Sequence, residues 1–266
     1  MNPDTYATRF PRVKILNASV NNITMGELVS EFKEGLLLTL HVDMIMKLQR
    51  DRDFYNILPE FDLITCDSQI LYFATKLLGS PVKERVSGSD FFPLYYMHNK
   101  ENADVKIFLC GGSPGIADMA KNNINEKVGR KIIVGTYSPS FEFDKDPDEI
   151  QLMIDRINKS EATVLLVGLG GGRQEKFIVN YRDQFSHVKT FLPLGGTIDY
   201  EARTFKRPSA WITEWGLEWL YRLIKEPKQR WRRYILHQPP VLFYLLSQRL
   251  GFYKNPFESA KESSVR

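Results

Sequence analysis

Short apolar runs, many of them rich in β-branched residues, alternate with longer segments of helical periodicity between residues 13 and 192. The apolar runs predict strands at 13–20, 36–42, 63–66, 105–110, 131–136, 163–168 and 188–192. The periodic segments predict helices at 25–34, 43–56, 68–78, 90–100, 116–128, 147–159 and 174–184. Because this alternation is typical of βαβ units, we expect an α/β fold with a Rossmann-like, mostly parallel sheet flanked by helices.

The strand pattern stops near Glu201, where a segment rich in tryptophan and arginine begins. Basic residues in this segment outnumber acidic ones, and they are Arg203, Lys206, Arg207, Arg222, Lys225, Lys228, Arg230, Arg232 and Arg233. We therefore predict an α/β catalytic domain at 1–202 and a helical C-terminal appendage at 203–266.

Three tryptophans of the appendage, Trp211, Trp215 and Trp219, recur every four residues. Aromatic residues at helical spacing usually pack inside a protein. A tryptophan face surrounded by arginines also fits an interfacial helix that binds anionic lipid headgroups. Nucleic acid is a third partner for such a basic cluster, but no nucleic-acid-binding module accompanies it. We expect the appendage to contact a membrane surface. An exposed apolar stripe would also favour association of the chain into homo-oligomers.

Composition narrows the class of protein further. The 266 residues are 43% hydrophobic and 26% charged with a net charge of +4, which suits a folded domain. The N-terminus lacks a signal-peptide pattern, and no apolar run approaches the ~18–20 residues that a membrane-spanning helix needs. Cys66 and Cys110 each lie in an apolar stretch and are expected to be buried free thiols. We expect a cytoplasmic protein that associates peripherally with the inner face of the cell membrane.

Two glycine-rich turns each follow a predicted strand and precede a predicted helix. The turn at 111–115 lacks both the P-loop and the G-x-G-x-x-G pattern, so it is either a phosphate contact or simply a tight connection. The turn at 168–172 leads into Arg173, Gln174 and Glu175. There the backbone could approach a nucleotide or sugar, or Glu175 could merely complement the helix N-terminus.

Polar residues also follow other predicted strands. Since ligands bind beyond the carboxyl ends of parallel strands, Thr39, His41 and Asp67 should share one rim of the sheet. Asp67 is either a helix cap or a general base. Arg85 carries a guanidinium fork that suits phosphate or carboxylate. The four histidines show no metal-ligand spacing, so no metal site is predicted. No cofactor is predicted either.

Five segments in this order resemble the WecG/TagA/CpsF family of bacterial glycosyltransferases over about residues 12–236. They are TCDSQIL (65–71), ERVSGSDFF (84–92), FLCGGSPGIA (108–117), VGLGGGRQEKFI (167–178) and RPSAWITEWGLEWLYRLIKEPKQRWRRY (207–234). The resemblance implies an inverting, metal-independent transferase. It would move N-acetylmannosamine or a related hexose from a UDP-sugar to a polyprenyl-diphosphate-linked saccharide during cell-envelope polysaccharide assembly.

The resemblance also assigns roles to residues. Asp67 falls at the family's catalytic-base position, and Thr39, Arg85 and Gln174 fall at positions resembling its active-site threonine, arginine and glutamine. Residues expected to contact substrate, from the turns, the strand ends and the tail, are His41, Gly111, Gly112, Gly168, Gly170, Arg173, Glu175, Asp199, Arg207, Arg222, Arg230 and Arg233.

Departures from the family pattern bear on the donor sugar. The usual Asp-Gly reads Asp67-Ser68, and His41 replaces an asparagine. The family's Pro-Lys-Gln-Glu element begins with Gly172-Arg173 here, and its Arg-Ala-Pro is replaced at 207–209.

Two rival functions remain. One is a dinucleotide-dependent oxidoreductase, which the missing glycine fingerprint opposes, and the other is a non-catalytic membrane-associated scaffold of the same fold.

Overall fold

The computed structural model describes residues 6, 9–204, 212, 215, 218–225 and 227–258. Its strands are β1 (Arg12–Ile15), β2 (Ala18–Asn21), β3 (Gly35–Leu40), β4 (Leu63–Cys66), β5 (Ile107–Gly111), β6 (Ile133–Tyr137), β7 (Val164–Gly168) and β8 (Thr190–Pro193). Its helices of the α/β part are α2 (Met25–Glu31), α3 (Val42–Lys47), α4 (Arg52–Asn56), α5 (Gln69–Leu77), α6 (Gly88–His98), α7 (Ile116–Val128), α8 (Pro147–Lys159), α9 (Arg173–Tyr181) and α10 (Thr197–Glu201), with short 3-10 turns η1 (Leu58–Glu60), η2 (Phe143–Lys145) and η3 (Arg182–Gln184). Towards the C-terminus follow α12 (Glu218–Lys225), α13 (Pro227–Trp231), the π-helical η4 (Arg232–His237) and α14 (Pro240–Arg249).

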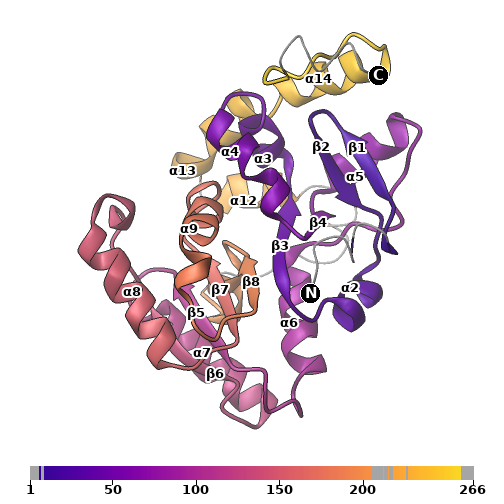
Figure 1. Ribbon diagram of the computed structural model, residues 1–266. Helices are drawn as coiled ribbons and strands as arrows, with labels where there is room; N and C mark the ends of the chain where they lie inside the picture. The colour runs from indigo at the N-terminus through magenta and orange to yellow at the C-terminus, as the bar shows by residue number, and fades with distance from the viewer. Residues whose placement is uncertain are drawn as a thin grey trace.

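Six of the strands form one sheet in the order β4-β3-β8-β7-β5-β6. Every neighbouring pair in it is parallel, so all carboxyl ends lie along one edge (Figure 1). The predicted α/β fold with a Rossmann-like parallel sheet is therefore confirmed. Strands β1 and β2 form a separate antiparallel hairpin beside β4, where the Asn21 side chain accepts a hydrogen bond from the Ile64 amide at 2.9 Å.

The core lies on both faces of the sheet. Side chains alternate along each strand, so Leu36 and Leu38 of β3 join one apolar cluster and Leu37 joins the other. The first cluster also contains buried residues of α3, α5, α8, α9 and α14, and the second contains residues of α2, α6, α7 and α10. A sheet buried on both faces explains why its strands read as continuous apolar runs.

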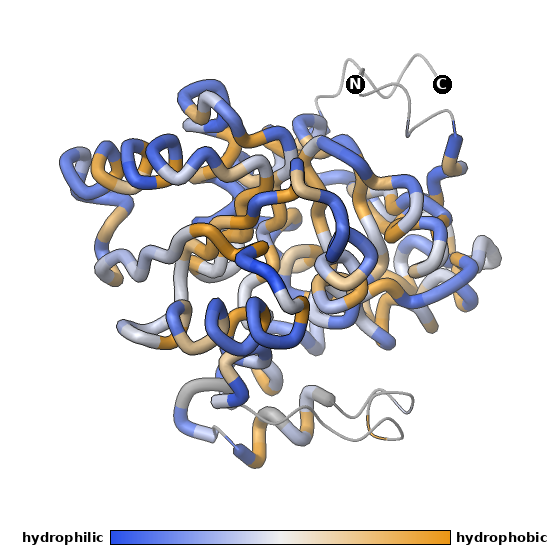
Figure 2. Tube along the Cα trace, turned by 90° about the horizontal axis from the view of Figure 1, so that it is seen from below, coloured by the Kyte–Doolittle hydropathy of each residue, from blue (hydrophilic) through white to orange (hydrophobic). Residues whose placement is uncertain are grey.

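The covering helices begin where local signals favour a start. Asp146 caps α8, because its side chain accepts hydrogen bonds from the Asp148 and Glu149 amides. The next residue is Pro147, and proline suits the first position of a helix. Buried residues of this helix recur at helical spacing and are Ile150, Met153, Ile154 and Ile157. Hydrophilic and hydrophobic residues accordingly alternate along the helices around the sheet (Figure 2).

Two predicted elements are wrong in detail. The predicted strand at 13–20 is two strands, because the chain reverses at Leu16, whose φ of 55° lies in the left-handed region. The predicted helix at 43–56 is interrupted, because the Asp51 side chain accepts from the Phe54 amide and starts α4 anew. Apolar periodicity continues through both breaks, so it could not reveal them.

The C-terminal helix α14 packs onto the α/β part rather than standing apart. Val241 and Leu245 are buried in the same cluster as β1 and α3. The Gln248 side chain accepts from the Leu16 amide at 2.7 Å, and the Tyr253 hydroxyl donates to Gln49 at 2.7 Å. Figure 1 shows α14 and the adjoining C-terminal segment next to α3, α4 and the β1–β2 hairpin. Residues 240–258, the C-terminal segment, are thus anchored to α3 and to the β1–β2 hairpin.

Candidate active site

A cavity of about 920 Å³ opens beyond the carboxyl ends of four adjacent strands, β4, β3, β8 and β7. This is where ligands bind in open parallel sheets, and the volume suits a ligand as large as a nucleotide sugar. Residues of α3 and α10 and of the C-terminal segment complete its walls. Of the residues predicted for the site, it gathers Thr39, His41, Asp67, Arg85, Gly168, Gly170, Gln174 and Asp199.

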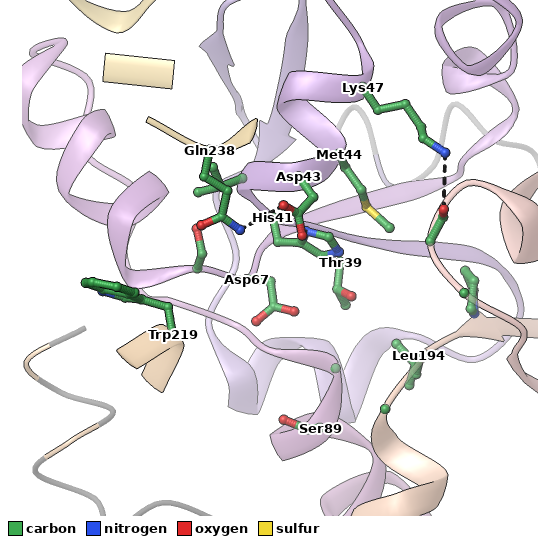
Figure 3. Close-up of a pocket in the computed structure, with 18 of the residues that line it drawn as sticks. Thr39, His41, Asp43, Met44, Lys47, Asp67, Ser89, Leu194, Trp219 and Gln238 are labelled. Carbon is green, nitrogen blue, oxygen red and sulfur yellow. Dashed lines mark hydrogen bonds and ion pairs between the residues drawn. The ribbon is translucent and has the colours of Figure 1, made fainter. Parts of the chain in front are cut away.

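Asp67 directly follows β4, and its amide donates to the Leu40 carbonyl at 2.9 Å, which continues the sheet pairing. The cap of α5 is the next residue, Ser68, whose hydroxyl accepts from the Leu71 amide at 3.2 Å. The Asp67 carboxylate is therefore not used as the helix cap. It points into the cavity and is 25% exposed (Figure 3).

Arg85 lies beside that carboxylate. Its Nη1 is 3.9 Å from Asp67 Oδ1 and donates to the Asp67 carbonyl at 3.3 Å, and its Nη2 donates to Asp90 at 3.0 Å. Asp90 is held in turn by the Ser87 hydroxyl, which donates to it at 2.7 Å while capping α6. Two carboxylates thus fix the guanidinium at the cavity wall, only 18% exposed.

Thr39 and His41 come from the carboxyl end of β3. Thr39 is buried, and Gly88 allows α6 to approach it, since a Cβ at Gly88 would lie 3.2 Å from Thr39 Oγ1. His41 Nδ1 is 3.7 Å from Asp43 Oδ2, and Asp43 Oδ1 accepts from Gln238 at 2.7 Å (Figure 3). A polar chain therefore links the sheet end to the C-terminal segment.

The turn at 168–172 forms the β7 side of the cavity. Gly170 and Gly172 have φ values of 92° and 89°, which favour glycine. Lys47 of α3 crosses this turn and donates to the Gly171 carbonyl at 3.2 Å (Figure 3). Gln174, 2% exposed, lies in the first turn of α9, behind the glycine-rich turn, and lines the cavity.

Four predicted substrate contacts do not line the cavity: Gly111, Gly112, Arg173 and Glu175. Gly111 has a φ of 134°, and a Cβ there would overlap the Gly168 backbone. The Arg173 guanidinium turns away to Asp144, with contacts of 2.6 and 2.9 Å, and lies 4.8 Å from the Phe143 ring centroid. Gly111 and Arg173 therefore have local structural roles.

Glu175, the fourth, is fully buried under the turn. One of its oxygens accepts from the Gly172 amide and the other from Gln174 Nε2 at 2.8 Å. Burial raises the pKa of this carboxyl to about 7, although the hydrogen bond from Gln174 opposes the shift. Glu175 thus complements the helix N-terminus, the simpler of its two interpretations from sequence.

The tail arginines are only partly described. Arg207 lies outside the described residues. The backbones of Arg222, Arg230 and Arg233 belong to α12, α13 and η4, while their side chains lie outside what the structure describes.

Several cavity residues were not among those predicted from the sequence. Lys47 and Asp43 lie in the predicted helix at 43–56, to which no site residue was assigned, and Gln238 lies in a segment with no predicted site. Trp219 and Tyr234 also line the cavity, with ring centroids 6.1 Å apart. The basic, aromatic composition around these two residues was the available signal, and it suggested both a lipid contact and a wall of the active site.

The described residues also bear on metal and thiol chemistry. They contain no group of three or more His, Cys, Asp or Glu side chains arranged to hold a metal ion. Cys66 and Cys110 are buried free thiols, as predicted, and burial raises the pKa of each to about 12. In the same part of the chain, no helix is sufficiently long and apolar to cross a bilayer.

Comparison with known proteins gives concordant results. Residues 13–255 match the family model described as "Glycosyl transferase WecG/TagA/CpsF family". The chain is 28% identical over 226 residues to an N-acetylglucosaminyldiphosphoundecaprenol N-acetyl-beta-D-mannosaminyltransferase of Bacillus subtilis, covering 84% of each protein. A protein of the same name from Bacillus spizizenii is 28% identical over 207 residues, covering 76% of this chain and 75% of the relative.

Proposed function

The chain belongs to the WecG/TagA/CpsF family of glycosyl transferases, and we propose that it transfers N-acetylmannosamine or a related hexose from a UDP-sugar to a polyprenyl-diphosphate-linked saccharide. The names of its two Bacillus relatives support an acceptor carried on a diphosphate-linked polyprenol, as in cell-envelope polysaccharide synthesis. The single observation that carries the proposal is the Asp67 carboxylate, which is not used as a helix cap and faces the cavity beside Arg85.

The reaction proposed is an inverting, SN2-like displacement. Asp67 removes the proton from the acceptor hydroxyl as that oxygen attacks the anomeric carbon of the donor. The bond from the anomeric carbon to the diphosphate oxygen breaks, and UDP leaves with the electron pair. The sugar is thereby joined to the acceptor with inverted configuration.

The leaving diphosphate carries negative charge, which the site must stabilise. Arg85 presents a planar guanidinium at the cavity wall, and Lys47 brings an ammonium to the turn after β7. Such preorganised cations stabilise charge as it develops in the transition state. We propose that these two residues, joined by the tail arginines, perform this role without a metal ion.

The appendage at 203–266 is proposed to contact the inner face of the cell membrane, where a polyprenyl-linked acceptor would lie. Large apolar side chains of α14 and the residues after it are exposed, namely Leu242, Phe243, Leu246, Leu250 and Phe252. The chain has no Asp or Glu between Pro227 and Phe257, whereas it has six Lys and Arg there. Apolar side chains flanked by basic ones favour an anionic lipid surface.

The test is UDP release by the purified full chain, across several UDP-sugars, with a short-chain prenyl-diphosphate saccharide as acceptor. We expect release that requires the acceptor and is fastest with one N-acetylhexosamine donor. No release with any donor, together with tight binding of NAD(H), would favour the oxidoreductase alternative instead. Tight UDP-sugar binding without release would favour the non-catalytic scaffold.

A further inference from the structure

Gln174 Oε1 is the one buried side-chain polar atom, within the part of the chain that the structure describes, without a hydrogen-bond partner. The side chain is 2% exposed and lines the cavity. A buried polar atom without a partner costs free energy, and buried polar atoms in folded proteins are nearly always paired. The atom therefore suggests a ligand that supplies the missing donor.

The direction of the Gln174 amide follows from its neighbours. Its Nε2 donates to Glu175 Oε1 at 2.8 Å and to the Pro193 carbonyl at 2.9 Å. Both partners are acceptors, so the nitrogen must face them and the oxygen must face the other way. A Cβ on Gly195 would lie 3.7 Å from Oε1, which places the oxygen next to the open turn after β8.

Glu175 holds this arrangement in place. It is fully buried, and its second oxygen accepts from the Gly172 amide. The ionised carboxylate, which dominates above pH 7, has only acceptors, so it permits one orientation of the neighbouring amide. An amide at position 175 would carry both a donor and acceptors, and the Gln174 amide could then turn around.

We propose that Glu175 fixes the Gln174 amide so that Gln174 Oε1 accepts a hydrogen bond from a neutral N–H or O–H of the bound nucleotide sugar. Gln174 is then a specificity-determining residue, and Glu175 is a positioning residue that acts through it. The inference rests on the proposed function. An inward-facing oxygen would repel phosphate oxygens, so the partner is the uridine part or the transferred sugar and not the diphosphate.

Binding of UDP, a UDP-hexose and the matching UDP-N-acetylhexosamine, measured by calorimetry, tests the proposal. Gln174→Met keeps the side-chain length but removes the acceptor, and we expect about tenfold weaker binding of the preferred UDP-sugar, as for one lost hydrogen bond. Weaker binding of UDP as well would assign the donor to the uridine part, which is the nucleobase or its ribose. Weaker binding of only the UDP-sugars would assign the sugar.

Glu175→Gln should weaken the same ligand by a similar factor, and Gln174→Met/Glu175→Gln should bind no more weakly than Gln174→Met alone, because Glu175 acts through Gln174. Gln49→Met is the matched control: Gln49 is also buried, but both ends of its amide have partners outside the cavity. It should alter thermal stability and leave binding unchanged.

Two results would overturn the inference. One is unchanged binding of all three ligands by Gln174→Met. The other is a further loss of binding when Glu175→Gln is added to Gln174→Met, since Glu175 would then act by another route. If the wild-type chain binds no UDP-sugar at all, the proposed function fails, which is a different outcome from either.

Discussion

The two glycine-rich turns of this protein have the same place in the fold and different uses. One follows β5 at 111–115 and the other follows β7 at 168–172, and these strands are neighbours in the sheet. Only residues of the second turn line the cavity. From the sequence, both are small-residue connections between an apolar strand and a helix.

The difference lies in what approaches each backbone. A Cβ at Gly111 would overlap the backbone of Gly168, so glycine is needed there because two strand ends touch. A Cβ at Gly170 or Gly171 would meet nothing within 4 Å, because the cavity opens above them. A glycine-rich turn therefore indicates close approach, and only the fold shows whether protein or ligand approaches.

The largest expected effect is on stability at the first turn. Gly111→Ala adds a Cβ that overlaps backbone atoms at a φ of 134°, so we expect it to lower the free energy of unfolding by about 3 kcal/mol or more. Urea unfolding of the purified variant measures this change. If Gly111→Ala were as stable as the wild type, the ends of β5 and β7 would not be in contact.

The buried Glu175 carboxyl at the second turn should make the free energy of unfolding depend on pH, with a change of similar size. The pKa of Glu175 is raised from 4.5 to about 7, so the folded chain holds this proton more tightly than the unfolded chain. The stability that the proton contributes is complete below pH 4.5 and lost as pH rises to about 7, a change of about 3 kcal/mol in the free energy of unfolding.

Urea unfolding between pH 4.5 and 7.5 should show this decline in the wild type and a shallower one in Glu175→Gln. Asp118→Asn is a matched control, since Asp118 lies in the first turn of the helix after the other glycine-rich turn and is exposed. Equal slopes for the wild type and Glu175→Gln would contradict the prediction.

Substitutions of two basic residues near the second turn should differ in their effect on activity. Lys47 lines the cavity and Arg173 points away to Asp144. Lys47→Met should lower kcat/KM by about 10- to 100-fold, as for a lost charge-assisted hydrogen bond to the diphosphate. Arg173→Met should leave kcat/KM within about twofold, because a partly exposed ion pair affects mainly stability. The reverse ranking would place the diphosphate on the outer side of the turn.

The smallest expected effect on stability is at the open part of the second turn. A methyl group at Gly171 would meet no atom within 4 Å, so Gly171→Ala should change the free energy of unfolding by less than about 1 kcal/mol. The same methyl group would project where ligand is proposed to bind, so UDP-sugar affinity should fall. Unchanged affinity would show that ligand does not approach this backbone.

Much of the fold could be predicted from the sequence, because the strands buried on both faces read as uninterrupted apolar runs. The run at 63–66 and the periodic segments at 116–128 and 147–159 coincide with β4, α7 and α8. The β1–β2 hairpin could not be predicted, because its reversal at Leu16 uses a left-handed φ at a residue that rarely adopts one.

The candidate site was predictable where residues directly follow strands. Thr39, His41 and Asp67 share the cavity because parallel strands end along one edge. Side-chain direction could not be read from spacing. Arg173 and Gln174 are adjacent in the chain, yet one pairs with a surface carboxylate and the other faces the cavity.

The proposed reaction depends on the Asp67 carboxylate, which acts as the base in the cavity beyond β4. The most direct measurement is the rate of sugar transfer by Asp67→Asn at saturating UDP-sugar and prenyl-diphosphate acceptor, with UDP affinity measured alongside. We expect kcat to fall by about 10²- to 10⁴-fold, with folding and UDP binding retained. A variant that transfers sugar at near the wild-type rate would contradict it.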